Sequence, residues 1–269
     1  MTPSPIPKVL STLSSHAVRH LLMGGQACVF YGAAEFSRDT DIVLLADQEN
    51  LHRLRAALED LAAERIAVPP LELDYLSRGH AVHFRCRRED VSGMRLDVMS
   101  VMRGVDPFRE LWERRTTVQL PEGLAVELLS LPDLVQAKKT QRDKDWPMLR
   151  RLVEAHYAQH ENHPAAEHVR FWLREARTPA LLVRTARRYP ADASAVALER
   201  PLLVHTQAEE AEMLERALEE EARGERARDR EYWRPLIREL EALRHQETRR
   251  RHAESMRPED EGYTGERGE

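Results

Sequence analysis

Three aspartates are the residues of this sequence whose type and position most suggest chemistry. Asp39 and Asp41 flank Thr40 at the start of an apolar, β-branched run that ends at Leu45. Successive side chains of a strand point to opposite faces, so the two aspartates share one face. Two neighbouring carboxylates repel each other unless a cation lies between them, and oxygen ligands suit Mg²⁺ bound to a triphosphate. The spacing therefore predicts a metal-binding pair.

A third carboxylate, Asp97, lies between apolar residues in the expected strand 95–99. A charge in such a place is costly unless it is solvated in a cleft, paired or bound to metal. If this strand lies beside the strand of Asp39, three carboxylates converge, as two-metal phosphoryl transfer requires. The alternative is an ion pair between Asp97 and Arg85 or Arg95.

Two adjacent glycines, Gly24 and Gly25, follow a short expected strand that ends at Met23. Because glycine has no Cβ, this turn lets a phosphate approach the backbone closely. The helix expected after it, 26–31, would point its free N–H groups at the same anion. A glycine pair alone marks many turns, so its meaning here comes from its order with the aspartates.

Taken together, Gly24-Gly25, Tyr31-Gly32, Asp39-Thr40-Asp41 and Asp97 resemble the motif of the nucleotidyltransferase superfamily, which has a polymerase-beta-like fold. The resemblance covers about residues 19–155 and is nearest to the bacterial branch that includes AbiEii-type toxins. It implies that the three aspartates are both catalytic and metal-binding. It also implies two bound Mg²⁺ ions and a nucleoside triphosphate, such as ATP, as the substrate.

The same resemblance implies a helix near the nucleotide within residues 129–145. Lys138 is our first candidate for a triphosphate contact, and Lys139 is the second. Ser37 and Arg38, which directly precede the acidic pair, are further candidates for binding the nucleotide. The alternative for each basic residue is a solvated surface position or the neutralisation of nearby carboxylates.

The motif departs from the family pattern at Thr40, where a larger apolar residue is usual. Sliding the register so that Asp41 and Val43 form the pair would leave one carboxylate missing and predict a degenerate site. We prefer the ungapped register, because the glycine pair and Tyr31-Gly32 then keep their usual distance from Asp39.

The elements that must position these residues alternate between strands and helices up to about Ser130. The expected strands are 19–23, 40–45, 80–86, 95–99, 116–120 and 124–129. The expected helices are 9–18, 26–31 and 48–63, the last with leucines at helical spacing after a capping Asp47. Some neighbouring strands are close enough to be antiparallel. The mixture predicts an α/β (α+β) fold built on a mixed sheet.

Beyond Ser130 the pattern is almost continuously helical, with prolines at the breaks. The expected helices are 131–140 (capped by Ser130), 146–160, 163–177, 180–189, 207–223 and 226–251. We expect a nucleotidyltransferase-like domain over residues 1–145, a mostly helical domain over 146–255 and a disordered tail over 256–269.

The composition indicates where in the cell the protein is found more than it indicates the function. The net charge of −5 argues against a protein built chiefly to bind nucleic acid by bulk electrostatics, although a local basic groove remains compatible. No apolar run reaches the roughly 20 residues that span a bilayer, and the N-terminus lacks the pattern of a secretory signal. Cys28 and Cys86 could form a disulfide, but buried reduced thiols fit a cytoplasmic protein better.

The predicted reaction is Mg²⁺-dependent transfer of a nucleoside monophosphate from a nucleoside triphosphate to an acceptor hydroxyl, with release of pyrophosphate. The acceptor could be RNA such as tRNA, a protein or a small molecule, and the helical half would select it. The chief alternative is a catalytically degenerate binding protein of the same fold, such as an antitoxin or a regulator. A metal-dependent nuclease is a further alternative. The sequence predicts neither nucleotide preference nor oligomeric state.

Overall fold

A mixed β-sheet forms the N-terminal half of the molecule in the computed structural model, which describes residues 5–121, 123–206 and 211–255. Within these residues seven strands pair in the order β3-β4-β5-β2-β1-β7-β6. The strands are β1 (His20–Met23), β2 (Asp39–Leu44), β3 (Glu64–Arg65), β4 (Val82–Arg85), β5 (Arg95–Met99), β6 (Thr116–Gln119) and β7 (Ala125–Leu128).

The sheet is mixed because its central strand, β2, has neighbours of both directions. β2 runs antiparallel to β1 and parallel to β5, while β1 is parallel to β7. The outer pairs β3–β4, β4–β5 and β6–β7 are antiparallel. The α/β (α+β) class expected from the sequence is confirmed, and so is the helical character of the C-terminal half.

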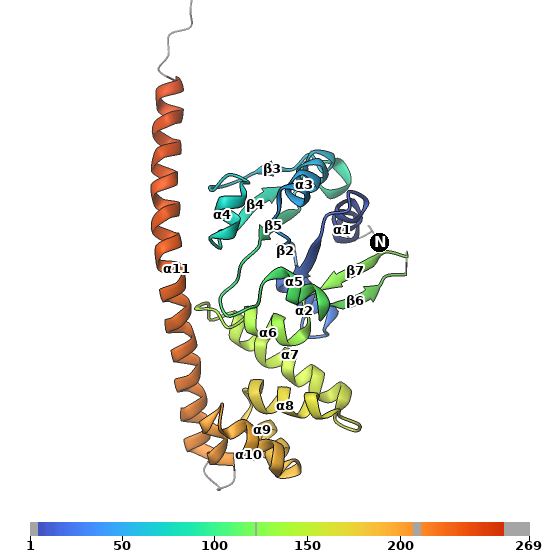
Figure 1. The fold of residues 1–269 in the computed structure, drawn as a ribbon, viewed down its shortest axis with the longest axis vertical. Coiled ribbons are helices and arrows are strands. Elements are labelled where there is room, and N and C mark those ends of the chain that lie inside the picture. Colours follow the sequence, from blue (N-terminus) through green and yellow to red (C-terminus); the bar gives the residue numbers. More distant parts are fainter. Residues whose placement is uncertain (1–4, 122, 207–210, 256–269) are drawn as a thin grey trace, which may run out of the picture.

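Helices surround the sheet and then form the lower part of the molecule (Figure 1). Those in the sheet half are α1 (Pro5–Ser15), α2 (Gly24–Phe30), α3 (Gln48–Asp60), α4 (Leu73–Ser77) and α5 (Phe108–Glu113), with a 3₁₀ turn η1 (Glu89–Val91). Those in the helical half are α6 (Leu131–Ala137), α7 (Asp145–His160), α8 (Ala166–Glu175), α9 (Pro179–Arg188), α10 (Pro190–Ala197) and α11 (Ala211–Ser255), with a 3₁₀ turn η2 (Pro201–Thr206).

Local sequence signals fix where two of the helices begin. The Asp47 side chain accepts a hydrogen bond from the Asn50 amide at 2.7 Å and caps α3, as expected. Ser130 caps α6 by accepting from the Asp133 amide, with Pro132 in the first turn. The elements that the sequence did not indicate, β3, α4, α5 and α10, have at most eight residues each.

One contiguous apolar core joins the sheet to the helices. Its buried members run from Ile6 in α1 to Leu218 in α11 and include Trp172, which is fully buried in α8. Both cysteines, Cys28 and Cys86, are buried free thiols, which confirms that expectation.

The last helix differs from its prediction. The sequence indicated helices at 207–223 and 226–251, but α11 is one helix of 45 residues that runs through Gly224 and Pro235. A glycine inside a helix costs about 1 kcal/mol relative to alanine, which contacts on either side can offset. Residues 207–210 and the expected tail 256–269 lie outside the described residues.

At 1.5 Å per residue α11 is about 68 Å long, and it stands beside the whole molecule (Figure 1). It is also highly charged. Across the described ranges, no helix combines the length and the apolar character that a membrane crossing requires.

Candidate active site

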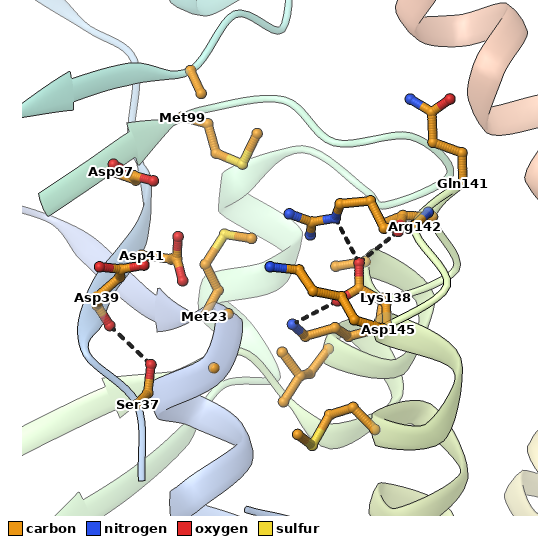
Figure 2. Close-up of a pocket in the computed structure, with 18 of the residues that line it drawn as sticks. Met23, Ser37, Asp39, Asp41, Asp97, Met99, Lys138, Gln141, Arg142 and Asp145 are labelled. Carbon is orange, nitrogen blue, oxygen red and sulfur yellow. Dashed lines mark hydrogen bonds and ion pairs between the residues drawn. The ribbon is translucent and has the colours of Figure 1, made fainter. Parts of the chain in front are cut away.

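The three aspartates lie together on one face of the sheet, at its centre. Along β2 the side chains of Asp39 and Asp41 line a cleft, whereas Thr40 between them is fully buried. The parallel pairing of β2 and β5 makes Asp97 the Cα partner of Asp41 (Figure 2). The ungapped register of the motif thus brings three carboxylates together, and Val43 lies further along the strand, fully buried. We call the three aspartates, together with Gly24 and Gly25, the sheet wall.

Each of the two glycines makes room for a different side chain, Gly24 for the Asp41 carboxylate and Gly25 for Ser37. Gly24 has a positive φ of 67°, and a Cβ there would lie 1.9 Å from the Asp41 Oδ2 atom. A Cβ at Gly25 would lie 2.7 Å from the Ser37 hydroxyl oxygen. Met23, the residue before them, is the Cα partner of Asp41 across the β1–β2 ladder. The group that approaches the glycine turn most closely in the structure is therefore this carboxylate.

The pKa values of Asp41 and Asp97 are shifted in opposite directions. Burial, and then the negative charge of Asp97, raise the pKa of Asp41 above its ordinary value, although Lys138 and a backbone hydrogen bond from Gly25 oppose the rise. A carboxylate under such repulsion is stabilised by a nearby cation.

Asp97 is held by two cationic or titratable neighbours. Burial alone would raise the pKa of Asp97, but hydrogen bonds from His83 and Arg95 outweigh it and lower the pKa. Arg95 Nε lies 2.8 Å and His83 Nδ1 2.9 Å from the same oxygen, Oδ1. Oδ2 has no hydrogen-bond partner among the described residues. The ion pair with Arg95 was one of the alternatives for this residue, and it occupies only half of the carboxylate.

A second side of the cleft is basic. Lys138, Thr140, Arg142, Lys144 and Asp145 lie at the end of α6 and the start of α7, and we call them the basic loop. Asp145 gathers three of its neighbours: its oxygens lie 3.4 Å from Lys138 Nζ, 2.8 Å from Arg142 Nε and 2.5 Å from the Thr140 hydroxyl. Asp145 therefore orients this group toward the carboxylates across the cleft (Figure 2).

The predicted nucleotide-binding residues divide between the cleft and other places. Ser37 and Lys138 line the cleft, with the Ser37 hydroxyl donating to the Asp39 carbonyl oxygen at 3.2 Å. Arg38 is not among the lining residues, and its guanidinium lies 5.8 Å from the ring centre of Phe36.

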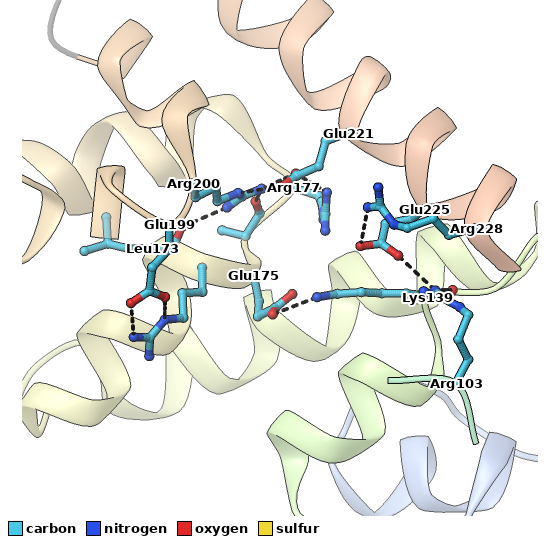
Figure 3. Close-up of polar contacts among 12 residues, drawn as sticks. Arg103, Lys139, Leu173, Glu175, Arg177, Glu199, Arg200, Glu221, Glu225 and Arg228 are labelled. Carbon is cyan, nitrogen blue, oxygen red and sulfur yellow. Dashed lines mark hydrogen bonds and ion pairs between the residues drawn. The ribbon is translucent and has the colours of Figure 1, made fainter. Parts of the chain in front are cut away.

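Lys139 also lies away from the cleft, although it follows Lys138 directly. Its ammonium group lies 2.8 Å from a carboxylate oxygen of Glu175, at the end of α8 (Figure 3). The chain leaves the α6 helix at Lys138, so neighbouring side chains diverge, one to the sheet and one to the helical half.

The third side of the cleft comes from α11. Its residues Asp229, Trp233 and Leu240 line the cleft, and we call them the helix wall. Trp233 was not among the residues to which the sequence assigned a site role, because nothing in its local pattern shows which surface α11 meets.

Acidic residues of α11, many of them four positions apart, hold the helix against the rest of the molecule. Their partners lie in both halves: Glu221 with Arg177 and Arg200, Glu225 with Arg103, Asp229 with Arg103 and the Gln141 amide, Glu239 with Arg78 and His80, and Glu247 with Arg65. Figure 3 shows the pairs at Glu221 and Glu225. Asp229 is only 2% exposed and accepts from the Gln141 amide at 2.7 Å, so it joins the helix wall to the main chain between Thr140 and Arg142 of the basic loop.

The three sides enclose a cleft of about 570 Å³, a size suited to a small molecule or a nucleotide. His83 and Arg95 also line it, and the sequence analysis assigned no site role to His83. The signal in the sequence was a polar His83 directly before the apolar Phe84 in an expected strand. That His83 is the partner of Asp97 follows from the pairing of β4 with β5.

A comparison of the sequence with models of known protein families gives no match. A comparison with curated proteins likewise finds no significant match. The interpretation of the site therefore depends on its own geometry.

Proposed function

We propose that the protein is a metal-dependent nucleotidyltransferase that moves a nucleoside monophosphate from a nucleoside triphosphate to an acceptor hydroxyl. The observation that carries the proposal is the in-register placement of Asp41 and Asp97, with Asp39 on the same face and a glycine turn against them. Resemblance to the nucleotidyltransferase superfamily, drawn from the same residues, supports it.

The donor set fits Mg²⁺, a cation that prefers oxygen ligands. Asp39 and Asp41 would hold two ions between them, and Asp97 would bind one through Oδ2. Burial and then like-charge repulsion raise the pKa of Asp41, and such cations would relieve the repulsion. Bound Mg²⁺ would supply charge neutralisation for the triphosphate and for the departing pyrophosphate.

In the proposed reaction the acceptor oxygen forms a bond to the α-phosphorus, and the bond from that phosphorus to the β-phosphate oxygen breaks. Pyrophosphate leaves with the electron pair of the broken bond. Asp97 would help to activate the acceptor by holding an ion beside it, and the acceptor's hydroxyl proton would pass to solvent. Lys138, on the basic loop, faces the carboxylates and would contact the triphosphate.

A catalytically degenerate binding protein of the same fold is the competing proposal, and one observation favours it. Arg95 forms an ion pair with Asp97 Oδ1 and His83 contacts the same oxygen, so this carboxylate has part of its charge satisfied without metal. A binding protein would still hold a nucleotide but would not transfer it.

The test is incubation of the purified protein with each α-labelled nucleoside triphosphate and Mg²⁺, together with RNA, protein or small-molecule fractions of a bacterial lysate. We expect label to appear in one fraction and pyrophosphate to be released. Asp41→Asn and Asp97→Asn should each lower the rate by at least about 100-fold, because each removes a ligand of a charge-stabilising cation.

Asp74→Asn is the matched control, because Asp74 is exposed on α4 and, among the described residues, its one ion pair is with Arg78, on α4's C-terminal flank. Its rate should equal that of the wild type. Full activity in both cleft variants would refute the proposal. Nucleotide binding by folded wild type without any transfer would support the binding protein instead.

A further inference from the structure

A group of three histidines lies where α7 meets α8. His156 and His160 are one turn apart on α7, so their side chains share a face, and His168 on α8 is opposite them. The ring centres lie 4.3 Å apart for His156–His160, 4.9 Å for His156–His168 and 4.5 Å for His160–His168. Each ring offers a nitrogen that lies within 4.8 Å of those of the other two.

The ring nitrogens of the three histidines differ in their hydrogen bonding. His160 Nδ1 lies 2.9 Å from the carbonyl oxygen of His156, to which it can only donate, so its Nε2 carries a lone pair. His168 Nδ1 is buried and has no hydrogen-bond partner. Buried polar atoms are normally satisfied, so this nitrogen calls for a ligand that the protein itself does not supply.

The group carries little compensating negative charge. Glu167 is the one carboxylate paired with it in the described structure; its oxygen lies 4.0 Å from His168 Nε2, and its side chain is 84% exposed. Burial, and then the rings of His160 and His168, lower the pKa of His156 to about 4.

We propose that His156, His160 and His168 bind one divalent transition-metal ion, with Zn²⁺ as the best-matched type. Three imidazoles without a carboxylate suit Zn²⁺, Cu²⁺ or Ni²⁺ and not Mg²⁺. Nitrogens at ~2.05 Å around tetrahedral zinc are ~3.3 Å apart. The three rings would therefore have to rotate so that their nitrogens, now within 4.8 Å of one another, approach by at most about 1.5 Å. The fourth position would be open to solvent.

To bind a metal ion, His156 would give up its hydrogen bond with Trp172. The Trp172 indole N–H now donates to His156 Nδ1 at 2.9 Å, so the neutral ring carries its proton on Nε2. Binding through either nitrogen releases the indole, and the fluorescence of Trp172 should therefore change with metal.

The proposed ion would fasten α7 to α8 and is separate from the cleft. Asp145, at the start of α7, belongs to the basic loop, and His156 is eleven residues further along the helix. At 1.5 Å per residue that distance is ~17 Å. The site is thus independent of the proposed transferase reaction.

The experiment uses the full chain without a histidine tag, freed of metal by a chelator. It is titrated with Zn²⁺ in competition with a chromophoric chelator, with Mg²⁺ in excess to occupy the carboxylates of the cleft. We expect one equivalent to bind, a rise in melting temperature and a change in tryptophan fluorescence. Co²⁺ in place of Zn²⁺ should give visible absorption bands typical of tetrahedral nitrogen ligation.

His160→Ala and His168→Ala should each weaken Zn²⁺ binding by at least 10-fold. His52→Ala, an exposed histidine of α3, and Asp41→Asn, in the cleft, should leave it unchanged. Melting curves in chelator show whether each variant is folded. Absence of Zn²⁺ binding by the wild type, binding that survives both histidine variants, or loss in Asp41→Asn would overturn the proposal.

Discussion

The sheet wall and the helix wall of the cleft face each other but are fixed by different interactions. Asp41 and Asp97 are held in register by the main-chain hydrogen bonds of β2 and β5, with apolar residues behind them. The helix wall depends on side-chain ion pairs that join α11 to both halves of the chain, such as Asp229 with Arg103. Backbone ladders are insensitive to salt, whereas ion pairs weaken as ionic strength rises. The face that carries the three carboxylates is therefore the fixed side, and α11 is the adjustable one.

The largest expected effect is on the sheet wall, from Gly24→Ala. The new Cβ would combine an unfavourable positive φ with a contact of 1.9 Å to Asp41 Oδ2. We expect a loss of about 3–5 kcal/mol in the free energy of unfolding, from backbone strain and from displacement of the carboxylate. Urea denaturation measures the loss in the free energy of unfolding. Mg²⁺-dependent nucleotide binding, which should disappear, measures the displacement of the Asp41 carboxylate.

Gly93→Ala is the matched control, because Gly93 has a positive φ of 81° and nothing lies within 4 Å of a Cβ there. It should lose only about 1–2 kcal/mol, the cost of the left-handed backbone alone. Equal losses in the two variants would show that the close approach of Asp41 is not what requires glycine.

On the helix wall the sharpest test is Asp229→Asn. The substitution removes the charge that faces Arg103 and alters the contact with the Gln141 amide, both in a nearly buried position. We expect a loss of about 2 kcal/mol in the free energy of unfolding. Activity should fall less than in the sheet-wall variants, because α11 moves and the carboxylates do not.

Glu231→Gln, an exposed position of the same helix that pairs with Arg234, should change stability by less than about 0.5 kcal/mol. If Asp229→Asn behaved like this control, the ion pairs would not be what holds α11. If it abolished transfer as completely as Asp41→Asn, the distinction between the two walls would fail.

The smallest expected effect is a gain in stability from Asp41→Asn. The folded-state pKa of Asp41 is raised, so the ionised carboxylate destabilises the fold once the pH rises above the ordinary aspartate value. At pH 7 without divalent cations, the variant should melt at most about 2–4 °C higher than the wild type. The difference in melting temperature should vanish below about pH 4, where the Asp41 side chain of the wild type is uncharged, as the asparagine of the variant is at every pH.

Thermal melts across pH measure this, and added Mg²⁺ should raise the melting temperature of the wild type more than that of the variant. A variant less stable than the wild type at pH 7 would mean that Asp41 is a structural partner in its own right.

The sequence predicted those features that depend on residues close together in the chain. The caps at Asp47 and Ser130, and the shared face of Asp39 and Asp41, follow from helix and strand periodicity. The pairing of β2 with β5 was only a condition of the hypothesis, because strand order depends on contacts far apart in the chain.

Other features could not be read from local patterns. Lys138 and Lys139 differ by one position, and only the end of α6 decides that the first reaches the cleft and the second reaches Glu175. The continuity of α11 through Gly224 depends on partners in distant segments. The spacing of His156 and His160 was visible, but His168 joins them only once α7 and α8 fold back on each other.

The position of α11 late in the chain has a consequence for the newly made protein. From Asp97, the last of the three carboxylates, to Asp229 the ribosome must add 229 − 97 = 132 residues. At about 5–20 residues per second this takes about 7–26 s. During that interval a nascent chain carries its carboxylates with no helix across from them, so the cleft is completed only after α11 has been made.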